Sequence, residues 1–171
     1  MVKLFELKDN NYPMDNKERF VTLFQCRVKY KYIKYKIKNG KLINDELLEL
    51  QDVLKYFVKQ KYYFYVIKTC FLISEWHLKK KESDEMDADK SKEELQKHIV
   101  YLNFTHYVAI IYDINQRYFN DDKDYIKKNY KNCVIKKENN PQMKETIIKL
   151  CKDYNIKIIE NKLNKLSFFD F

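Results

Sequence analysis

Among its 171 residues the chain has a single glycine, Gly40, and this limits both its fold and its chemistry. Glycine is the residue that adopts positive φ at no steric cost, and tight phosphate-binding loops depend on it. The GxGxxG and GxxxxGK[ST] loops and the GxSxG nucleophile elbow each need at least two glycines. Nucleotide-binding and serine-hydrolase sites of these standard kinds are therefore excluded.

The single glycine follows a segment in which large side chains alternate with lysines. From Val28 to Tyr32 every second residue is apolar or aromatic, and the alternation resumes one residue out of phase from Ile33 to Ile37. A period of two is typical of a β-strand, and the slip in phase indicates a bulge. Asn39-Gly40 then has the composition of a type I′ turn. The pattern predicts a β-hairpin near the N-terminus.

Other segments predict helices. Apolar residues at helical spacing indicate a helix from about 45 to 59, with Asn44 or Asp45 as its cap. Ser91 and Glu94 have the spacing of a capping box, and Asn140 before Pro141 is a typical helix start. Strands are expected at 1–7, 20–26, 104–111, 133–135 and 156–159. Residues 62–73 suit either a buried strand or a core helix.

These elements together predict an α+β (mixed α/β) fold, in which helices pack on a small sheet that includes the N-terminal hairpin. We expect one compact globular domain over residues 1–160, since a chain of this length buries one ordinary core. Residues 79–92 are highly charged, with both signs mixed, and are expected to form an exposed loop. An apolar C-terminal peptide, 161–171, follows the domain.

The formal net charge of +9 suggests an anionic partner, but composition offers a second explanation. Residues with AT-rich codons are abundant and those with GC-rich codons are scarce, which indicates an AT-rich genome such as that of a virus or phage. No apolar run is long enough to span a membrane, and no secretory signal is evident. Four cysteines without a CxxC pair favour reduced thiols in an intracellular compartment (host cytoplasm, nucleoid or nucleus) and no metal or cofactor.

Lysines crowd the predicted hairpin and are its candidate nucleic-acid-binding residues. A row of cations along one strand can follow a phosphate backbone, and interleaved tyrosines can stack on unpaired bases. Arginine, which reads base edges, is scarce, so we expect DNA or RNA binding to be independent of sequence. The alternative is a solvent-exposed strand whose lysines prevent the edge of the sheet from pairing with another chain. The candidate residues are Lys29, Lys31, Lys34, Lys36, Lys38 and Lys41.

The C-terminal peptide is the second candidate site. Leu166, Phe168, Phe169 and Phe171 crowd the last six residues, although chain ends are usually polar. The segment 165–171 resembles the C-terminal clamp-binding peptides of replication proteins, such as archaeal clamp loaders and T4-like phage polymerases. The resemblance implies that Phe168 is the aliphatic-type anchor and that Phe169 and Phe171 enter or flank the pocket of a sliding clamp. The alternative is a terminus packed on its own core.

The remaining candidate is a divalent-metal nuclease. Glu160 and Lys162 follow a predicted strand, Asp113 ends another, and Glu6 with Lys8 forms a second acid-x-lysine pair. A chain of this composition contains about two such pairs by chance, so the pattern assigns no catalytic residue.

We therefore favour a small, basic, non-enzymatic accessory protein that associates with nucleic acid and docks on a replication or transcription partner through its C-terminal peptide. A module that binds protein, as an inhibitor of a host nucleic-acid enzyme or a subunit of an assembly, and the nuclease are the alternatives.

Overall fold

The computed structural model describes residues 16–40, 44–82, 87–112, 134–136 and 140–170, and this part of the chain is mostly helical. Its elements, in chain order, are α1 (Asn16–Lys38), α2 (Asn44–Lys59), α3 (Tyr63–Lys81), α4 (Ala88–Ile111), β1 (Val134–Lys136), α6 (Pro141–Asp153), α7 (Glu160–Asn164) and β2 (Phe168–Asp170). The two short strands pair antiparallel, with Ile135 opposite Phe169.

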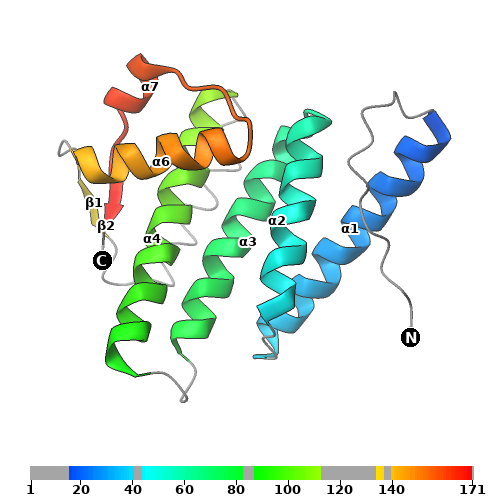
Figure 1. Cartoon of the computed structure of the whole chain (residues 1–171), viewed down its shortest axis with the longest axis horizontal. Helices are drawn as coiled ribbons and strands as arrows, with labels where there is room; N and C mark the ends of the chain where they lie inside the picture. The colour runs from blue at the N-terminus through cyan, green and yellow to red at the C-terminus, as the bar shows by residue number, and fades with distance from the viewer. Residues whose placement is uncertain (1–15, 41–43, 83–86, 113–133, 137–139, 171) are drawn as a thin grey trace.

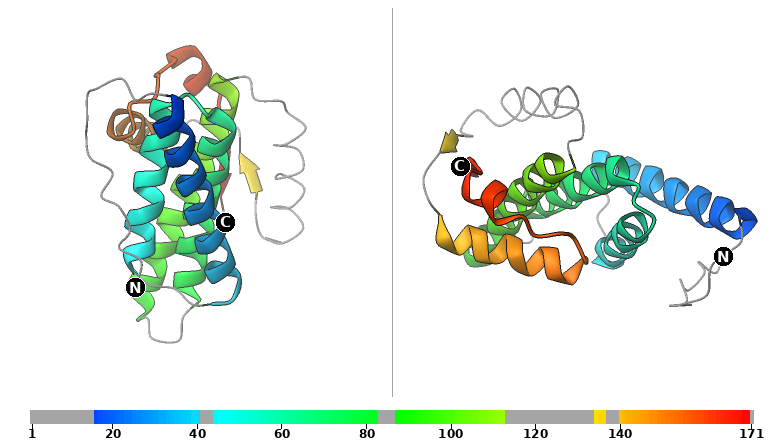
Figure 2. Two further views of the ribbon diagram at one scale, coloured as in Figure 1. Left: turned by 90° about the vertical axis from the view of Figure 1, so that its right-hand side faces the viewer. Right: turned by 90° about the horizontal axis from the view of Figure 1, so that it is seen from above.

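Helices α2, α3 and α4 lie side by side and form the centre of the molecule (Figure 1). Helix α3 packs along α4, and α2 packs on the other side of α3. Helix α1 contacts α2 and α3 at one edge of the bundle, while α6, α7 and β2 lie against α4 at the opposite edge. In Figure 2 one end of α1 extends away from the other helices. Much of the surface of α1 is therefore left outside the core.

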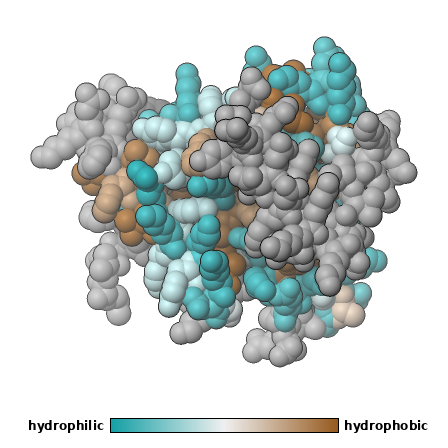
Figure 3. All heavy atoms as spheres, turned by 180° about the vertical axis from the view of Figure 1, so that it is seen from behind, coloured by the Kyte–Doolittle hydropathy of each residue, from teal (hydrophilic) through white to brown (hydrophobic). Residues whose placement is uncertain are grey.

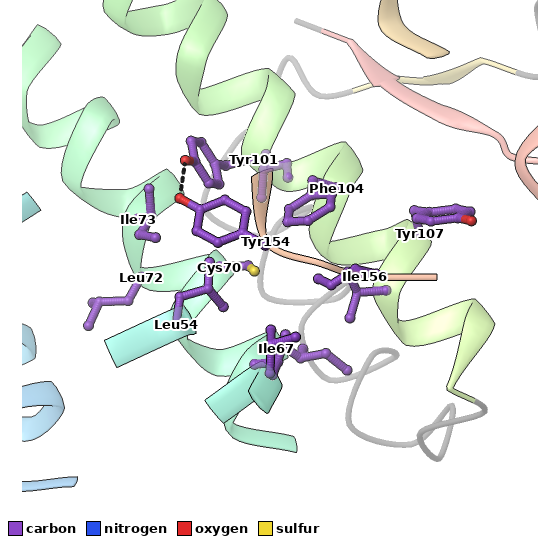
Figure 4. Packing of buried hydrophobic residues seen from close by; sticks show 14 of the residues in the cluster. Leu54, Ile67, Cys70, Leu72, Ile73, Tyr101, Phe104, Tyr107, Tyr154 and Ile156 are labelled. Carbon is purple, nitrogen blue, oxygen red and sulfur yellow. Dashed lines mark hydrogen bonds between the residues drawn. The ribbon is translucent and has the colours of Figure 1, made fainter. Parts of the chain in front are cut away.

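The core is continuous from α1 to β2 and is rich in aromatic and branched side chains. Trp76, Phe57 and Phe104 are among its largest fully buried residues. Tyr101 of α4 and Tyr154, which follows α6, are both buried, and their hydroxyl oxygens lie 3.1 Å apart (Figure 4). The pairing satisfies two phenol groups inside an apolar cluster and joins the C-terminal part of the chain to the bundle.

The predicted α+β (mixed α/β) class is wrong, because no hairpin and no larger sheet is present in the described residues. Residues 28–38, predicted to form a strand, belong to α1. Its buried residues Cys26, Ile33 and Ile37 recur at helical spacing and pack on the bundle. Gly40 does have positive φ, at +68°, but it follows the end of α1 instead of closing a hairpin.

Most other predicted strands are also wrong. Residues 20–26 lie in α1, and 104–111 form the last part of α4. Residues 156–159 are neither helix nor strand. Of the two alternatives for 62–73, the core helix is confirmed, because these residues lie almost wholly in α3. The strand predicted at 133–135 is displaced by one residue, as β1, and the strand predicted at 1–7 falls outside the described residues. The helical segments of α3 and α4 are buried on nearly all sides, so their apolar residues show no clear period.

Several local predictions are confirmed. The helix expected at 45–59 is α2. Asn140 caps α6 as predicted, because its side-chain oxygen accepts a hydrogen bond from the Met143 N–H at 2.9 Å and Pro141 opens the helix.

The predicted charged loop at 79–92 is shorter than expected. Helix α3 continues to Lys81 and α4 begins at Ala88, so only a short connection separates them. Asp87 caps α4 by accepting from the Lys90 N–H at 2.8 Å. The capping box predicted at Ser91 is therefore wrong, since Ser91 already lies inside the helix.

Candidate functional site

Helix α1 presents an apolar stripe to solvent on the side opposite its buried face. Val21, Phe24, Val28, Tyr32 and Tyr35 are 46%, 61%, 49%, 56% and 67% exposed. Their spacing of three or four residues places them in one row that is about 21 Å long at 1.5 Å per residue. Seen from behind, hydrophobic residues reach the surface beside hydrophilic ones (Figure 3). Contiguous exposed apolar surface of this kind marks an interaction site more often than scattered single residues do.

A stripe of cations runs beside the apolar stripe. Arg27, Lys31, Lys34 and Lys38 are all exposed, and their spacing of four, three and four residues aligns them along the helix. The row is about 17 Å long by the helical rise per residue. From residue 21 to residue 38 the sequence contains six cations and no acid. The cation row and the apolar stripe together form the outer surface of α1, which we call the α1 face. It combines a continuous positive surface with an apolar one beside it.

Two further lysines lie on the other flank of the apolar stripe. Lys29 and Lys36 are half-buried. Lys36 forms an ion pair with the buried Glu46 of α2, and this hydrogen bond raises the Lys36 pKa. The Lys36 ammonium also lies 4.9 Å from the centre of the Tyr32 ring. Lys36 thus holds α1 against α2, while Lys29 adds charge to the flank.

The predicted lysines therefore divide into three groups. Helix α1 brings Lys31, Lys34 and Lys38 together on one exposed row. It places Lys29 and Lys36 on the opposite flank, and Lys41 lies outside the described residues. Arg27 was missed because it precedes the alternating segment at 28–38, although in a strand it would share a face with Lys29 and Lys31. A helical wheel of 100° per residue would have found it.

The C-terminal candidate residues lie in the core. Leu166, Phe168 and Phe169 are only 2–3% exposed, and Phe171 lies outside the described residues. Asn103 of α4 holds Phe169 by its backbone, because the Asn103 side chain accepts from the Phe169 N–H at 2.7 Å and donates to the Phe169 C=O at 3.0 Å. Binding to a sliding clamp stays a prediction, and it requires these side chains to leave the core.

A buried polar cluster joins α3 to α4. His77 Nδ1 lies 2.6 Å from Glu94 Oε2, and His98 Nδ1 lies 2.7 Å and 2.9 Å from the hydroxyl and carbonyl oxygens of Ser74. The Ser74 hydroxyl donates to the His98 C=O at 2.9 Å, so we assign the proton of the neutral His98 ring to Nδ1. Sequence reasoning gave these residues no site.

Burial controls the protonation of this cluster. Desolvation lowers the His98 pKa to about 4, and it lowers the His77 pKa against the opposing effect of Glu94. Burial alone would raise the Glu94 pKa, but the hydrogen bonds from His77 and Lys97 outweigh it and lower the pKa. His98, His77 and Ser74 are 1%, 4% and 0% exposed, so the cluster pairs two helices and has little access to a substrate.

The nuclease candidates do not form a site in the described part of the chain. Glu160 is exposed in α7, and the Lys162 ammonium donates to the Ile110 C=O at 2.9 Å. Asp113, Glu6 and Lys8 lie outside the described residues. Within the described ranges, no three His, Cys, Asp or Glu side chains gather where they could hold a metal ion.

Three of the cysteines lie within the described residues, and all three are buried free thiols: Cys26, Cys70 and Cys151. Burial raises the pKa of Cys26 to about 11 and that of Cys151 to about 12, so these thiols are poor nucleophiles near neutral pH. Cys133 lies outside the described residues. The three described cysteines therefore contribute packing, and none of them suggests a reactive site.

None of the helices in the described part of the chain has the long apolar stretch that crossing a bilayer requires. Comparison with protein-family models, curated protein sequences and solved structures finds no match to this chain.

Proposed function

We propose that this protein is a non-enzymatic accessory protein that binds nucleic acid through the α1 face. The observation that carries the proposal is the exposed row Arg27, Lys31, Lys34 and Lys38, in a segment without a single acid. Four cations aligned on a rigid helix can neutralise phosphates of one backbone and release their counterions. The net charge of +9 adds attraction at longer range.

The composition of the row favours binding that does not depend on base sequence. Three of its four members are lysines, which bind phosphate as point charges. Arg27 has the forked donors that recognise guanine, but its guanidinium carbon lies 5.2 Å from the centre of the Tyr65 ring of α3. The Arg27 side chain is thus engaged with the bundle, and the row has no second guanidinium to read bases.

The buried position of the histidine cluster between α3 and α4 supports a non-enzymatic role. His77, His98 and Glu94 are all at most 8% exposed, and their hydrogen bonds link α3 to α4. A general base must come within hydrogen-bond distance of a substrate proton, which these groups do not do without opening the core. Nothing in this cluster is needed for electrostatic binding at α1.

Fluorescence anisotropy of a labelled oligonucleotide at several salt concentrations tests the proposal. With four phosphate contacts on a single strand, the slope of log affinity against log salt is about −3, so affinity falls about 50-fold from 50 to 200 mM salt. A triple variant, Lys31→Gln, Lys34→Gln and Lys38→Gln, leaves one cation in the row. Its affinity should fall only about 3-fold over the same range.

The matched control removes the same charge elsewhere. Lys149, Lys152 and Lys165 are exposed and lie outside α1, so changing all three to Gln lowers the net charge equally. We expect this control to keep the wild-type slope. If both triple variants bind alike, the α1 face is not the binding surface, and if the wild-type protein does not bind at low salt, the proposed function is wrong.

A protein-binding module is the second candidate, and the apolar stripe on α1 is the observation that favours it. Five residues at spacings of three and four have the pattern by which one helix packs against another. Such an interface would be much less sensitive to salt than phosphate binding. This candidate gains support if the protein binds no nucleic acid at low salt and the apolar stripe is protected from solvent in the presence of an acidic protein.

A further inference from the structure

We infer that the nucleic acid bound at the α1 face is single-stranded, with its phosphates on the cation row and its bases stacked on the exposed aromatic rings. This inference rests on the proposed function and names the substrate class of the same surface. It depends on the fact that α1 presents two kinds of side chain along one face. A duplex would engage only one of them.

The two stripes run parallel and overlap from residue 27 to residue 35, and the apolar stripe continues toward the N-terminus to Phe24 and Val21. At 100° per residue, the centres of the cation row and the apolar stripe are about 90° apart around the helix. On a helix about 11 Å across, this separation is about 9 Å of surface. A nucleotide whose phosphate contacts Lys31 or Lys34 can therefore reach the apolar stripe with its base. Both stripes extend over at least ten residues, so several consecutive nucleotides can repeat the arrangement.

Three of the five residues in the apolar stripe are aromatic. Tyr35 and Phe24 have the highest exposed fractions in the stripe, at 67% and 61%. Tyr32 is 56% exposed and has the Lys36 ammonium 4.9 Å from its ring centre. Aromatic rings bind bases of any sequence because every base has a π face. The stripe thus offers stacking without sequence preference.

A duplex fits this face less well. In a duplex the bases are paired and stacked on one another, so Phe24 and Tyr35 would stay in water or lie against phosphates. Major-groove recognition by a helix relies on side chains such as Arg, Asn and Gln that bond to base edges, and the exposed row supplies only Arg27. Only the electrostatic part of binding would remain for a duplex.

A second copy of this chain is also disfavoured as the occupant. If two α1 faces packed together, the cations of one copy would lie close to those of the other, with no acid between residues 21 and 38 to pair with them. The flanking charge instead complements a polyanion. A single-stranded nucleic acid supplies both the negative charge and the flat apolar surface that the two stripes require.

The test compares a labelled single strand of about 20 nucleotides with the duplex of the same sequence at one salt concentration. The key variant is Phe24→Ala with Tyr35→Ala, which removes two exposed rings and no charge. The control is Leu48→Ala, since Leu48 is an apolar residue of α2 with the same exposed fraction as Phe24, 61%. All three side chains are on the surface, and circular dichroism verifies that the variants fold.

We expect the wild-type protein to bind the single strand about 10-fold or more tightly than the duplex. The double aromatic variant should lose about 10-fold or more of its single-strand affinity, because each stacked base contributes substantially. Its duplex affinity and salt slope should stay unchanged, as should all values for Leu48→Ala.

Equal affinity for single strand and duplex, or unchanged single-strand binding by the double aromatic variant, would overturn the inference and leave the proposed function intact. Absence of binding to either nucleic acid at low salt would overturn both. Binding to vesicles of anionic lipid without binding to nucleic acid would also overturn both, and would assign the α1 face to a membrane surface.

Discussion

Asn103 is the residue whose removal should most directly weaken the attachment of the C-terminal segment. Its side chain is fully buried in α4 and makes three hydrogen bonds to backbone groups. The amide donates to the C=O of Ile99 and of Phe169, each at 3.0 Å, and the carbonyl accepts from the Phe169 N–H at 2.7 Å. Two of these bonds join residues 66 positions apart, so they contribute to tertiary structure and not to local structure.

Replacing Asn103 by alanine removes these partners from both backbone groups of Phe169. Phe169 is 2% exposed, so water cannot readily replace the lost bonds. Each buried group left without this partner costs about 1–3 kcal/mol, which gives an expected loss of about 3 kcal/mol in the free energy of unfolding. For a domain of this size the melting temperature should fall by about 6–12 °C. Asn103→Asp should be at least as destabilising, because a carboxylate cannot donate to the two carbonyls.

Urea unfolding followed by circular dichroism measures this loss. The control is Asn164→Ala, since Asn164 is exposed and its side chain accepts from the Lys144 ammonium at 3.2 Å. We expect this control to change the free energy of unfolding by less than about 0.5 kcal/mol. If Asn103→Ala is as stable as the control, the side chain does not hold the C-terminal segment, and the reasoning from these hydrogen bonds is refuted.

Three further predictions concern single side chains. Burial lowers the His98 pKa to about 4 in the folded protein, below the ordinary histidine value of 6.5. As pH falls, the unfolded state therefore binds the proton first. We expect the free energy of unfolding to decrease by about 3 kcal/mol between pH 6.5 and pH 4. His98→Asn should reduce this pH dependence in urea titrations, and an unchanged profile would assign it to other groups. Tyr154→Phe removes the hydroxyl that pairs with Tyr101 and should lower the free energy of unfolding by about 1 kcal/mol, measured by thermal unfolding. A stability equal to wild type would mean that the pair contributes nothing. Gly40→Ala meets no atom within 4 Å, yet its φ of +68° should destabilise the protein by about 1 kcal/mol, and a more stable variant would contradict this.

The sequence of α1 imitates a strand for a physical reason that also bears on the proposed function. A helix with one buried and one solvated face shows a clear apolar period of 3.6 residues. In α1 the buried residues Ile33 and Ile37 are matched on the outer side by Val28, Tyr32 and Tyr35. Apolar residues on opposite faces hide the helical period and leave an alternation that imitates a strand. The exposed stripe therefore caused the wrong prediction.

Helices α2 and α6 could be predicted because their surroundings are simpler. Helix α2 has one apolar face, and acids in its first turn mark its start. The start of α6 is marked by Asn140 and Pro141, whose effects are confined to one turn of helix. Helices α3 and α4 lack such a contrast, because the residues around Trp76 and Phe104 are buried on nearly every side.

The sequence by itself determined the features that depend on neighbouring residues. These are the cap at Asn140, the positive φ at Gly40 and the run of six cations without an acid. The tertiary structure decided which cations share a face and whether the Phe-rich terminus is exposed. It also paired His77 with Glu94 and Asn103 with Phe169. Caps and turns follow from local hydrogen bonds and backbone sterics, whereas burial depends on contacts between residues far apart in the chain, which no local pattern encodes.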